Sequence, residues 1–166
     1  KYCTGKRTTS SQKTKNFVKE CVNETTIEKE IQQVHSIVGR TTYGFNDPRR
    51  HKLKVLSTLL GDGSSSRLFQ AVREKLGMTY QINTFLNSYL DVSAFGVYYS
   101  TNDKQAGKVN EIVHREFNKL RNTEVKAKEL KRVKEYIKGN TLMSLESTTN
   151  RMIRLANSLL HYGKIV

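Results

Sequence analysis

The sequence predicts an α+β fold, in which a mixed, mainly antiparallel sheet carries helices packed on one face. The expected elements run strand, helix, helix, strand, strand, helix, helix along the chain. Two of the β-rich runs are separated by only a few residues, which is typical of a hairpin of antiparallel strands. This grouping of strands and helices favours an α+β layer over a regularly alternating parallel sheet.

The chain of 166 residues has room for one domain. Residues 1–26 are rich in Thr, Ser and Lys, and we expect them to form a linker or irregular entry segment. We expect residues 27–166 to form a single α+β domain. Because the chain begins Lys-Tyr-Cys, with no start Met and no signal-peptide pattern, we expect it to be a fragment of a longer chain. Its compartment is unknown.

The first strand and the first helix follow from residues 31–60. Residues 31–39 are β-rich and end at Gly39, a turn former, so we predict a strand there. A helix is predicted over residues 47–60, because Asp47 can cap its free amides and Pro48 suits its first position. Its core-facing stripe comprises Leu53, Leu56, Leu59 and Leu60.

A second helix is predicted over residues 65–76. Gly61-Asp62-Gly63 stops the first helix, the serines that follow can cap the second, and Gly77 ends it. Apolar residues recur at helical spacing at Leu68, Phe69, Val72 and Leu76. We expect Phe69 and Val72 to lie in one core with Leu56 and Leu59.

Two strands are predicted near residues 79–86 and 92–100, joined by a turn over residues 87–91. Asn102 with Gln105 resembles a capping box that opens the next helix. After Thr123 a long helical pattern continues towards Leu159. We expect a break in it near Gly139 or at residues 147–150.

The net charge of +14 suggests nucleic acid at first. The basic residues are spread along the whole chain, without interleaved aromatic residues or a nucleic-acid motif, so we expect no nucleic-acid partner. No apolar run is long enough to cross a bilayer, so we expect no membrane span. Cys3 and Cys21 are the only cysteines. A disulfide between them is possible, but two unpaired thiols is the simpler interpretation.

The sequence contains no recognisable metal or hydrolase motif. Its four histidines are scattered, and neither H-E-x-x-H nor H-x-x-E-H occurs, so we predict no metal site in this segment. No G-x-S-x-G elbow is present. The loop at residues 61–66 lacks the spacing and the lysine of a phosphate-binding loop.

Arg73 and Tyr80 lie seven residues apart, on either side of the helix-to-strand join at Gly77. A cation at the end of a helix dipole would by itself explain Arg73, and a half-buried aromatic residue would explain Tyr80. A turn at Gly77 can also direct both side chains into one space, where they offer donors to a peptide carbonyl or its oxyanion.

Over residues 31–164 the sequence resembles the carboxyl-terminal, non-zinc half of the pitrilysin/insulinase-type metallopeptidases, the family that includes the mitochondrial processing peptidases. No single segment carries this resemblance, which rests on the order of several short segments and on the gaps between them. The segments are Gln33-Val-His35, Asp47-Pro48-Arg49, Leu60-Gly61, Ser65-Ser-Arg67-Leu68-Phe69, Arg73-Glu-Lys-Leu-Gly77, Tyr80, Phe95-Gly96, Lys138-Gly139 and Ser144-Leu-Glu146-Ser147.

The resemblance implies a zinc-dependent metalloendopeptidase whose zinc and general base lie on another half, in the same chain or in a partner subunit. Arg73 and Tyr80 match the family's substrate-binding pair in order and spacing. The resemblance also implies an unfolded peptide or small protein as substrate. It implies zinc in the complete enzyme, but no zinc bound by this segment and no activity of the segment alone. A dimer is one possible assembly. The alternative is a non-catalytic structural or chaperone-like subunit of the same family.

Overall fold

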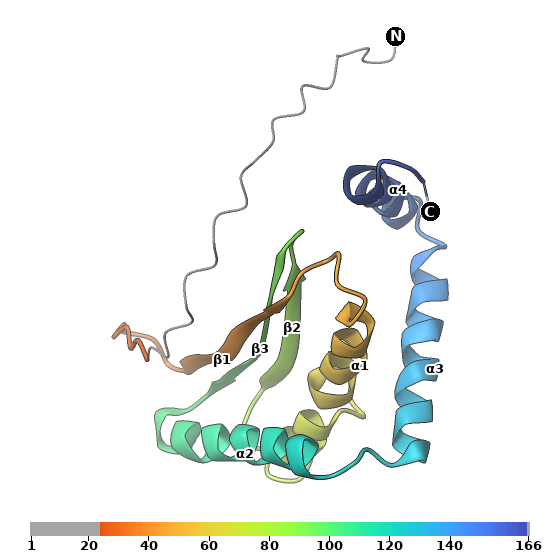
Figure 1. The fold of residues 1–166 in the computed structure, drawn as a ribbon. Coiled ribbons are helices and arrows are strands. Elements are labelled where there is room, and N and C mark those ends of the chain that lie inside the picture. Colours follow the sequence, from red (N-terminus) through yellow and green to blue (C-terminus); the bar gives the residue numbers. More distant parts are fainter. Residues whose placement is uncertain (1–23, 166) are drawn as a thin grey trace.

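The computed structural model describes residues 24–165. The fold is α+β, as predicted, and the expected order of elements is confirmed (Figure 1). Both cysteines lie outside the described residues. The predicted entry segment, residues 1–26, also lies outside them except for its last three residues. The elements in chain order are β1 Val34–Tyr43, α1 Arg50–Gly61, the π-helical segment η1 Phe69–Glu74, β2 Gln81–Ser88, β3 Val92–Thr101, α2 Asp103–Asn122, α3 Ala127–Ser144 and α4 Thr148–Tyr162.

The described strands form a sheet in the order β1-β3-β2, and both pairings are antiparallel. The predicted hairpin is therefore confirmed, with Ser88 opposite Ser93 at its closed end. Successive side chains of a strand point to opposite faces of a sheet. Phe95, Val97 and Tyr99 occupy every second position of β3 and therefore share one face. These residues belong to the buried core.

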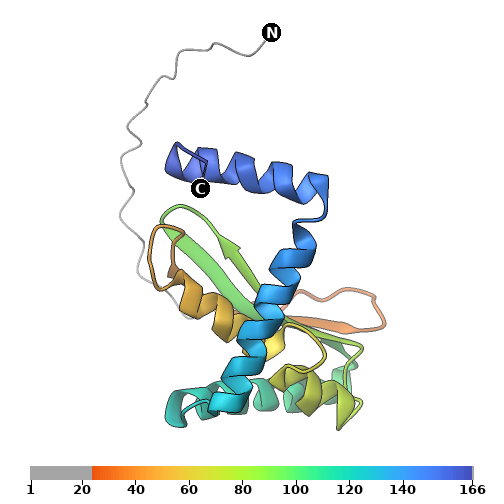
Figure 2. The ribbon, with the colours of Figure 1, turned by 90° about the vertical axis from the view of Figure 1, so that its right-hand side faces the viewer.

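The helices α1 and α2, together with η1, cover this one face of the sheet, and α3 packs on the outside of α1 (Figures 1 and 2). The helical part of the core consists of Leu53, Leu60, Leu68, Val72, Val109, Ile112 and Val113. Of the predicted core residues, Leu59 and Val72 are buried and Leu56 packs against the core. Phe69 is only half-buried and lies outside the core cluster, so its assignment to the core was wrong.

The first strand begins and ends later than residues 31–39. Gly39 does not end it, because Thr41, Thr42 and Tyr43 continue the strand with good β-formers. Gly39 is instead paired with Gly96 in the middle of the sheet. A Cβ at Gly39 would come within 2.9 Å of the Phe95 carbonyl oxygen, so this position has a packing reason to remain glycine.

Helix α1 begins at Arg50, later than predicted, after a turn over residues 45–49. The Asp47 carboxylate accepts hydrogen bonds from the backbone N–H and the guanidinium of Arg49, at 2.8 and 3.0 Å, rather than capping the helix itself. These hydrogen bonds from Arg49 lower the pKa of Asp47 to about 2. The helix ends at Gly61, as the glycine stop predicted.

The capping box at Asn102 is confirmed, since its side chain accepts a hydrogen bond of 3.0 Å from the backbone N–H of Gln105. The break in the last helical pattern falls at residues 145–147, between α3 and α4. Helix α3 continues through Gly139 without a break. Helix α4 lies apart from the sheet, and its end contacts the turn before α1, where His161 stacks on Phe45 at 4.1 Å (Figure 2). None of the described helices is long and apolar enough to cross a bilayer.

Candidate functional site

The candidate site is built around η1, which differs from the ordinary helix predicted over residues 65–76. Residues 67 and 68 begin the helix, and Phe69–Glu74 then widen into a π-helical turn. The backbone N–H of Lys75 accordingly bonds the carbonyl of Gln70, five residues earlier, at 3.2 Å. Such turns are rare and frequently occur at functional sites.

The serines before η1 do not cap it with their side chains. Ser66 is 3% exposed, and its hydroxyl has no hydrogen-bond partner among the described residues. The first turn is held instead by main-chain bonds, with the Ser66 carbonyl accepting from the N–H of Gln70 at 3.0 Å.

The π-helical turn ends at Glu74, and the chain reverses three residues later at Gly77, which has a φ of 58°. This left-handed conformation is strained for residues with a Cβ, which explains the glycine. The N–H of Gly77 bonds the carbonyl of Arg73 at 3.0 Å, and the N–H of Met78 bonds that of Val72 at 3.1 Å. The predicted end of the helix is therefore confirmed.

Arg73 lies in the last turn of η1, and its side chain is exposed. Its guanidinium carbon stands 4.9 Å from the centroid of the Phe69 ring. No ion pair involves Arg73 within residues 24–165. The guanidinium donors are thus not tied up by a carboxylate of the described chain.

Tyr80 lies just before β2 and is 80% exposed. The backbone next to it is fixed, because the buried Thr101 donates a hydrogen bond of 2.5 Å from its hydroxyl to the Met78 carbonyl. No hydrogen bond is found for the Tyr80 hydroxyl in the part of the chain that the structure describes. The ring is therefore not the half-buried aromatic residue of the simpler interpretation.

The structure places Arg73 and Tyr80 on either side of Gly77, both exposed, and neither a hydrogen bond nor a cation–π contact is found between them. Two hollows of the described residues, of about 170 and 60 Å³, lie between α1 and α3. Neither is lined by Arg73 or Tyr80. Both side chains of the pair are exposed at the surface of the described chain.

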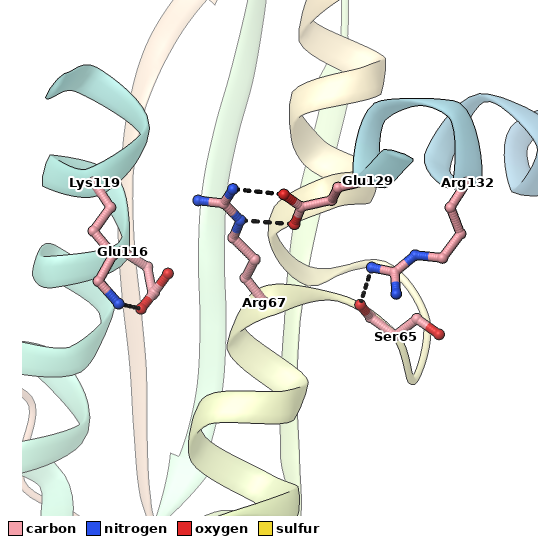
Figure 3. Close-up of polar contacts among 6 residues, drawn as sticks. All are labelled: Ser65, Arg67, Glu116, Lys119, Glu129 and Arg132. Atoms are coloured by element: carbon pink, nitrogen blue, oxygen red, sulfur yellow. Dashed lines mark hydrogen bonds and ion pairs between the residues drawn. The ribbon is translucent and has the colours of Figure 1, made fainter. Parts of the chain in front are cut away.

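An ion pair fixes the start of η1 to α3 (Figure 3). The Arg67 guanidinium donates to both carboxylate oxygens of Glu129, at 2.9 and 2.7 Å, and each side chain is only about one fifth exposed. These hydrogen bonds, with the charge of Arg67, hold the pKa of Glu129 below its ordinary value, although partial burial opposes the shift. Arg132 adds a second link by donating to the Ser65 carbonyl at 2.9 Å.

The described residues do not form a zinc site. The four histidines lie on β1, α1, α2 and α4, and no group of three His, Cys, Asp or Glu side chains comes together within residues 24–165. Zinc requires three or four convergent ligands, so these residues do not fit the ion.

Comparison with known proteins identifies the family. The family model described as the peptidase M16 inactive domain matches residues 4–137, which is more than half of the chain. The chain belongs to this family. The resemblance to the non-zinc half of the pitrilysin/insulinase-type peptidases is thereby confirmed.

Several relatives of this M16 inactive domain bear the names of proteases. The chain is 34% identical over 139 residues to the uncharacterized zinc protease YmxG of Bacillus subtilis, covering 84% of this chain and 34% of that protein. It is 31% identical over 160 residues to an uncharacterized zinc protease of Mycobacterium tuberculosis, covering 96% of this chain and 36% of that protein. The chain thus spans about a third of the length of these relatives.

Solved structures share the fold of the domain. A protease from Helicobacter pylori matches with a TM-score of 0.75 and 23% identity, over 81% of this chain and 33% of that chain. A chain of complex III2 from Candida albicans matches with a TM-score of 0.72 and 17% identity, over 84% of this chain and 35% of that chain. Identities this low show a common fold and nothing further.

Phe69 is a residue of the site that the sequence analysis missed. Its spacing from Val72 and Leu76 suggested a core residue, but the widened turn places its ring against Arg73. The available signal was an aromatic residue four positions before an arginine, a spacing that brings side chains together on a helix.

Proposed function

We propose that this chain is the substrate-binding half of a zinc-dependent metalloendopeptidase that hydrolyses peptides. The zinc ion and the general base lie on another half, in the same chain or in a partner subunit. The observation that carries the proposal is the exposed Arg73 and Tyr80 on either side of the Gly77 turn, in a domain described as the inactive domain of a peptidase family.

Each side chain has a distinct role in this proposal. The planar guanidinium of Arg73 offers several donors to the carbonyls of an unfolded peptide, and so positions the peptide. The hydroxyl of Tyr80 donates to the oxygen that becomes negative when the scissile carbonyl is attacked. Both require free donors, and neither side chain has a hydrogen bond in the described part of the chain.

A zinc-bearing other half is consistent with the finding that no three potential metal ligands come together within residues 24–165. When bound on the other half, zinc activates the attacking water and polarises the carbonyl. The proposal therefore assigns metal chemistry to the other half and substrate positioning to this one. It also requires the two halves to associate, within one chain or as a dimer.

Kinetics of the complete protein test the proposal, with an internally quenched, unstructured peptide as substrate. Tyr80→Phe removes one hydroxyl from an exposed ring, so stability should not change. Loss of an oxyanion donor should lower kcat by about 100- to 1000-fold. Arg73→Lys keeps the charge but loses the planar fork, so turnover should fall as well.

Matched control variants are Tyr89→Phe, in the turn between β2 and β3, and Arg121→Lys, on α2, which both alter exposed residues. Both should retain the kinetics of the unmodified protein. The alternative, a structural or chaperone-like subunit without peptidase activity, predicts no hydrolysis by the complete protein and no difference between Tyr80→Phe and Tyr89→Phe.

A further inference from the structure

We infer that Phe69 is a positioning residue for Arg73, holding its guanidinium in place by stacking; this inference rests on the proposed function of Arg73. The guanidinium carbon lies 4.9 Å from the centroid of the Phe69 ring, within the range of an attractive cation–π contact. The ring is the only partner found for the Arg73 guanidinium in the described part of the chain.

Packing alone does not account for a phenyl ring at this position. Its neighbours Leu68 and Val72 are fully buried in the core, whereas Phe69 is half-buried and lies outside that cluster. Its ring is thus available to a neighbour at the surface. The neighbour it meets is Arg73.

The π-helical turn makes this contact part of the local fold. The turn begins at Phe69 and ends at Glu74, so ring and guanidinium belong to the same widened segment. Gly77 then reverses the chain, and the hydrogen bond from the Thr101 hydroxyl to the Met78 carbonyl fixes the backbone that leads to Tyr80. An exposed arginine has many rotamers, and an aromatic face beneath it restricts them before substrate arrives.

The test is a double-mutant comparison in the complete protein, with an internally quenched, unstructured peptide as substrate. Phe69→Leu removes the ring face and keeps an apolar side chain, while Phe69→Tyr keeps the face. A cation–π contact at an exposed site corresponds to a change of about 2- to 5-fold. We expect Phe69→Leu to lower kcat/KM by that factor and Phe69→Tyr to preserve it.

The background without the guanidinium separates positioning from other roles. In Arg73→Gln protein, Phe69→Leu should cause no further loss of kcat/KM, because nothing remains to be positioned. A control is Phe117→Leu on α2, which removes a half-buried ring that packs against the core of the domain. It should change thermal stability without reproducing this dependence on Arg73.

Three outcomes would overturn the inference. An equal loss from Phe69→Leu in both backgrounds means that Phe69 acts on substrate or on stability by itself. Unchanged kcat/KM in Phe69→Leu, with a large loss in Arg73→Gln, removes the inference and leaves the proposed function standing. Unchanged kcat/KM in Arg73→Gln removes the proposed function, and this inference with it.

Discussion

At the scale of single residues, the structure separates side chains that stabilise the domain from those available for a substrate. Arg67 and Arg73 lie on the same short helical segment, yet their surroundings differ. Arg67 is mostly buried and paired with Glu129, whereas Arg73 is exposed, and the Phe69 ring is the one partner found for it within residues 24–165. Sequence alone does not distinguish the two arginines, because the carboxylate partner of Arg67 lies 62 residues away.

We expect Glu129→Gln to destabilise the protein at neutral pH by about 1–3 kcal/mol, because two charge-assisted hydrogen bonds lose the carboxylate. The folded-state pKa of Glu129 is lowered, so its contribution is complete above the ordinary value of 4.5 and is lost as pH falls through the folded-state value. Urea denaturation at pH 7 and at pH 3 measures this difference.

Glu135→Gln is the matched control, because its ion pair with Lys138 is exposed. Its effect should not exceed about 1 kcal/mol. A Glu129→Gln variant that is as stable as Glu135→Gln at pH 7 would mean that the link between η1 and α3 does not contribute to folding.

Phe69→Ala should cost about 1–2 kcal/mol in the free energy of unfolding, well below the 3–5 kcal/mol of a fully buried phenylalanine. The physical reason is that the ring lies outside the core cluster. Thermal or urea denaturation measures it, and a loss above 3 kcal/mol would place the ring in the core after all.

At the scale of elements, sequence patterns predicted the helices and strands but not all of their surroundings. The hairpin and the cap at Asn102 follow from local residues, so they were predictable. The π-helical turn was not, because apolar spacing assumes an ordinary helix. Leu76, which shares the helical spacing of Leu68 and Val72, is 44% exposed. Likewise, the apolar stripe of α4 predicts a helix but does not tell which surface it packs against. Its residues Met152, Leu155 and Leu159 are exposed in this structure.

The end of α1 provides a test of how closely the helix packs on the sheet. A Cβ at Gly61 would come within 2.7 Å of the backbone nitrogen of Thr84 on β2. Gly61→Ala should therefore destabilise the protein by about 1–3 kcal/mol, because backbone must move. The change in the urea midpoint measures this cost.

Gly107→Ala is the control for that substitution. Gly107 lies in α2, and a Cβ there meets nothing within 4 Å. Alanine should stabilise the helix by about 0.5–1 kcal/mol, since glycine loses more backbone freedom on folding. Effects of the same sign in the two variants would contradict the close packing of α1 on β2.

At the scale of the whole molecule, the chain spans about a third of the length of its curated relatives, which are named zinc proteases. The sequence allowed the family and the fold to be predicted, because the order and gaps of many short segments are retained. In the proposed function, zinc and its general base lie on another half, which is not among the described residues. In that proposal, the exposed Arg73 and Tyr80 of this chain hold the peptide that the zinc-bearing half cleaves.

If this domain supplies no zinc ligands, the isolated segment should bind no stoichiometric zinc and should cleave no peptide. Metal analysis of the purified segment, with the complete protein as the control, measures the first property. One tightly held zinc ion per isolated segment would contradict the division of roles between the two halves.

The most direct test of the central claim is peptide turnover per bound zinc ion in the complete protein carrying both Tyr80→Phe and Arg73→Lys. We predict that zinc content is unchanged while turnover per zinc falls at least about 100-fold, because a donor to the developing oxyanion is lost and the metal is held elsewhere. Turnover per zinc within about twofold of the unmodified protein would contradict the account.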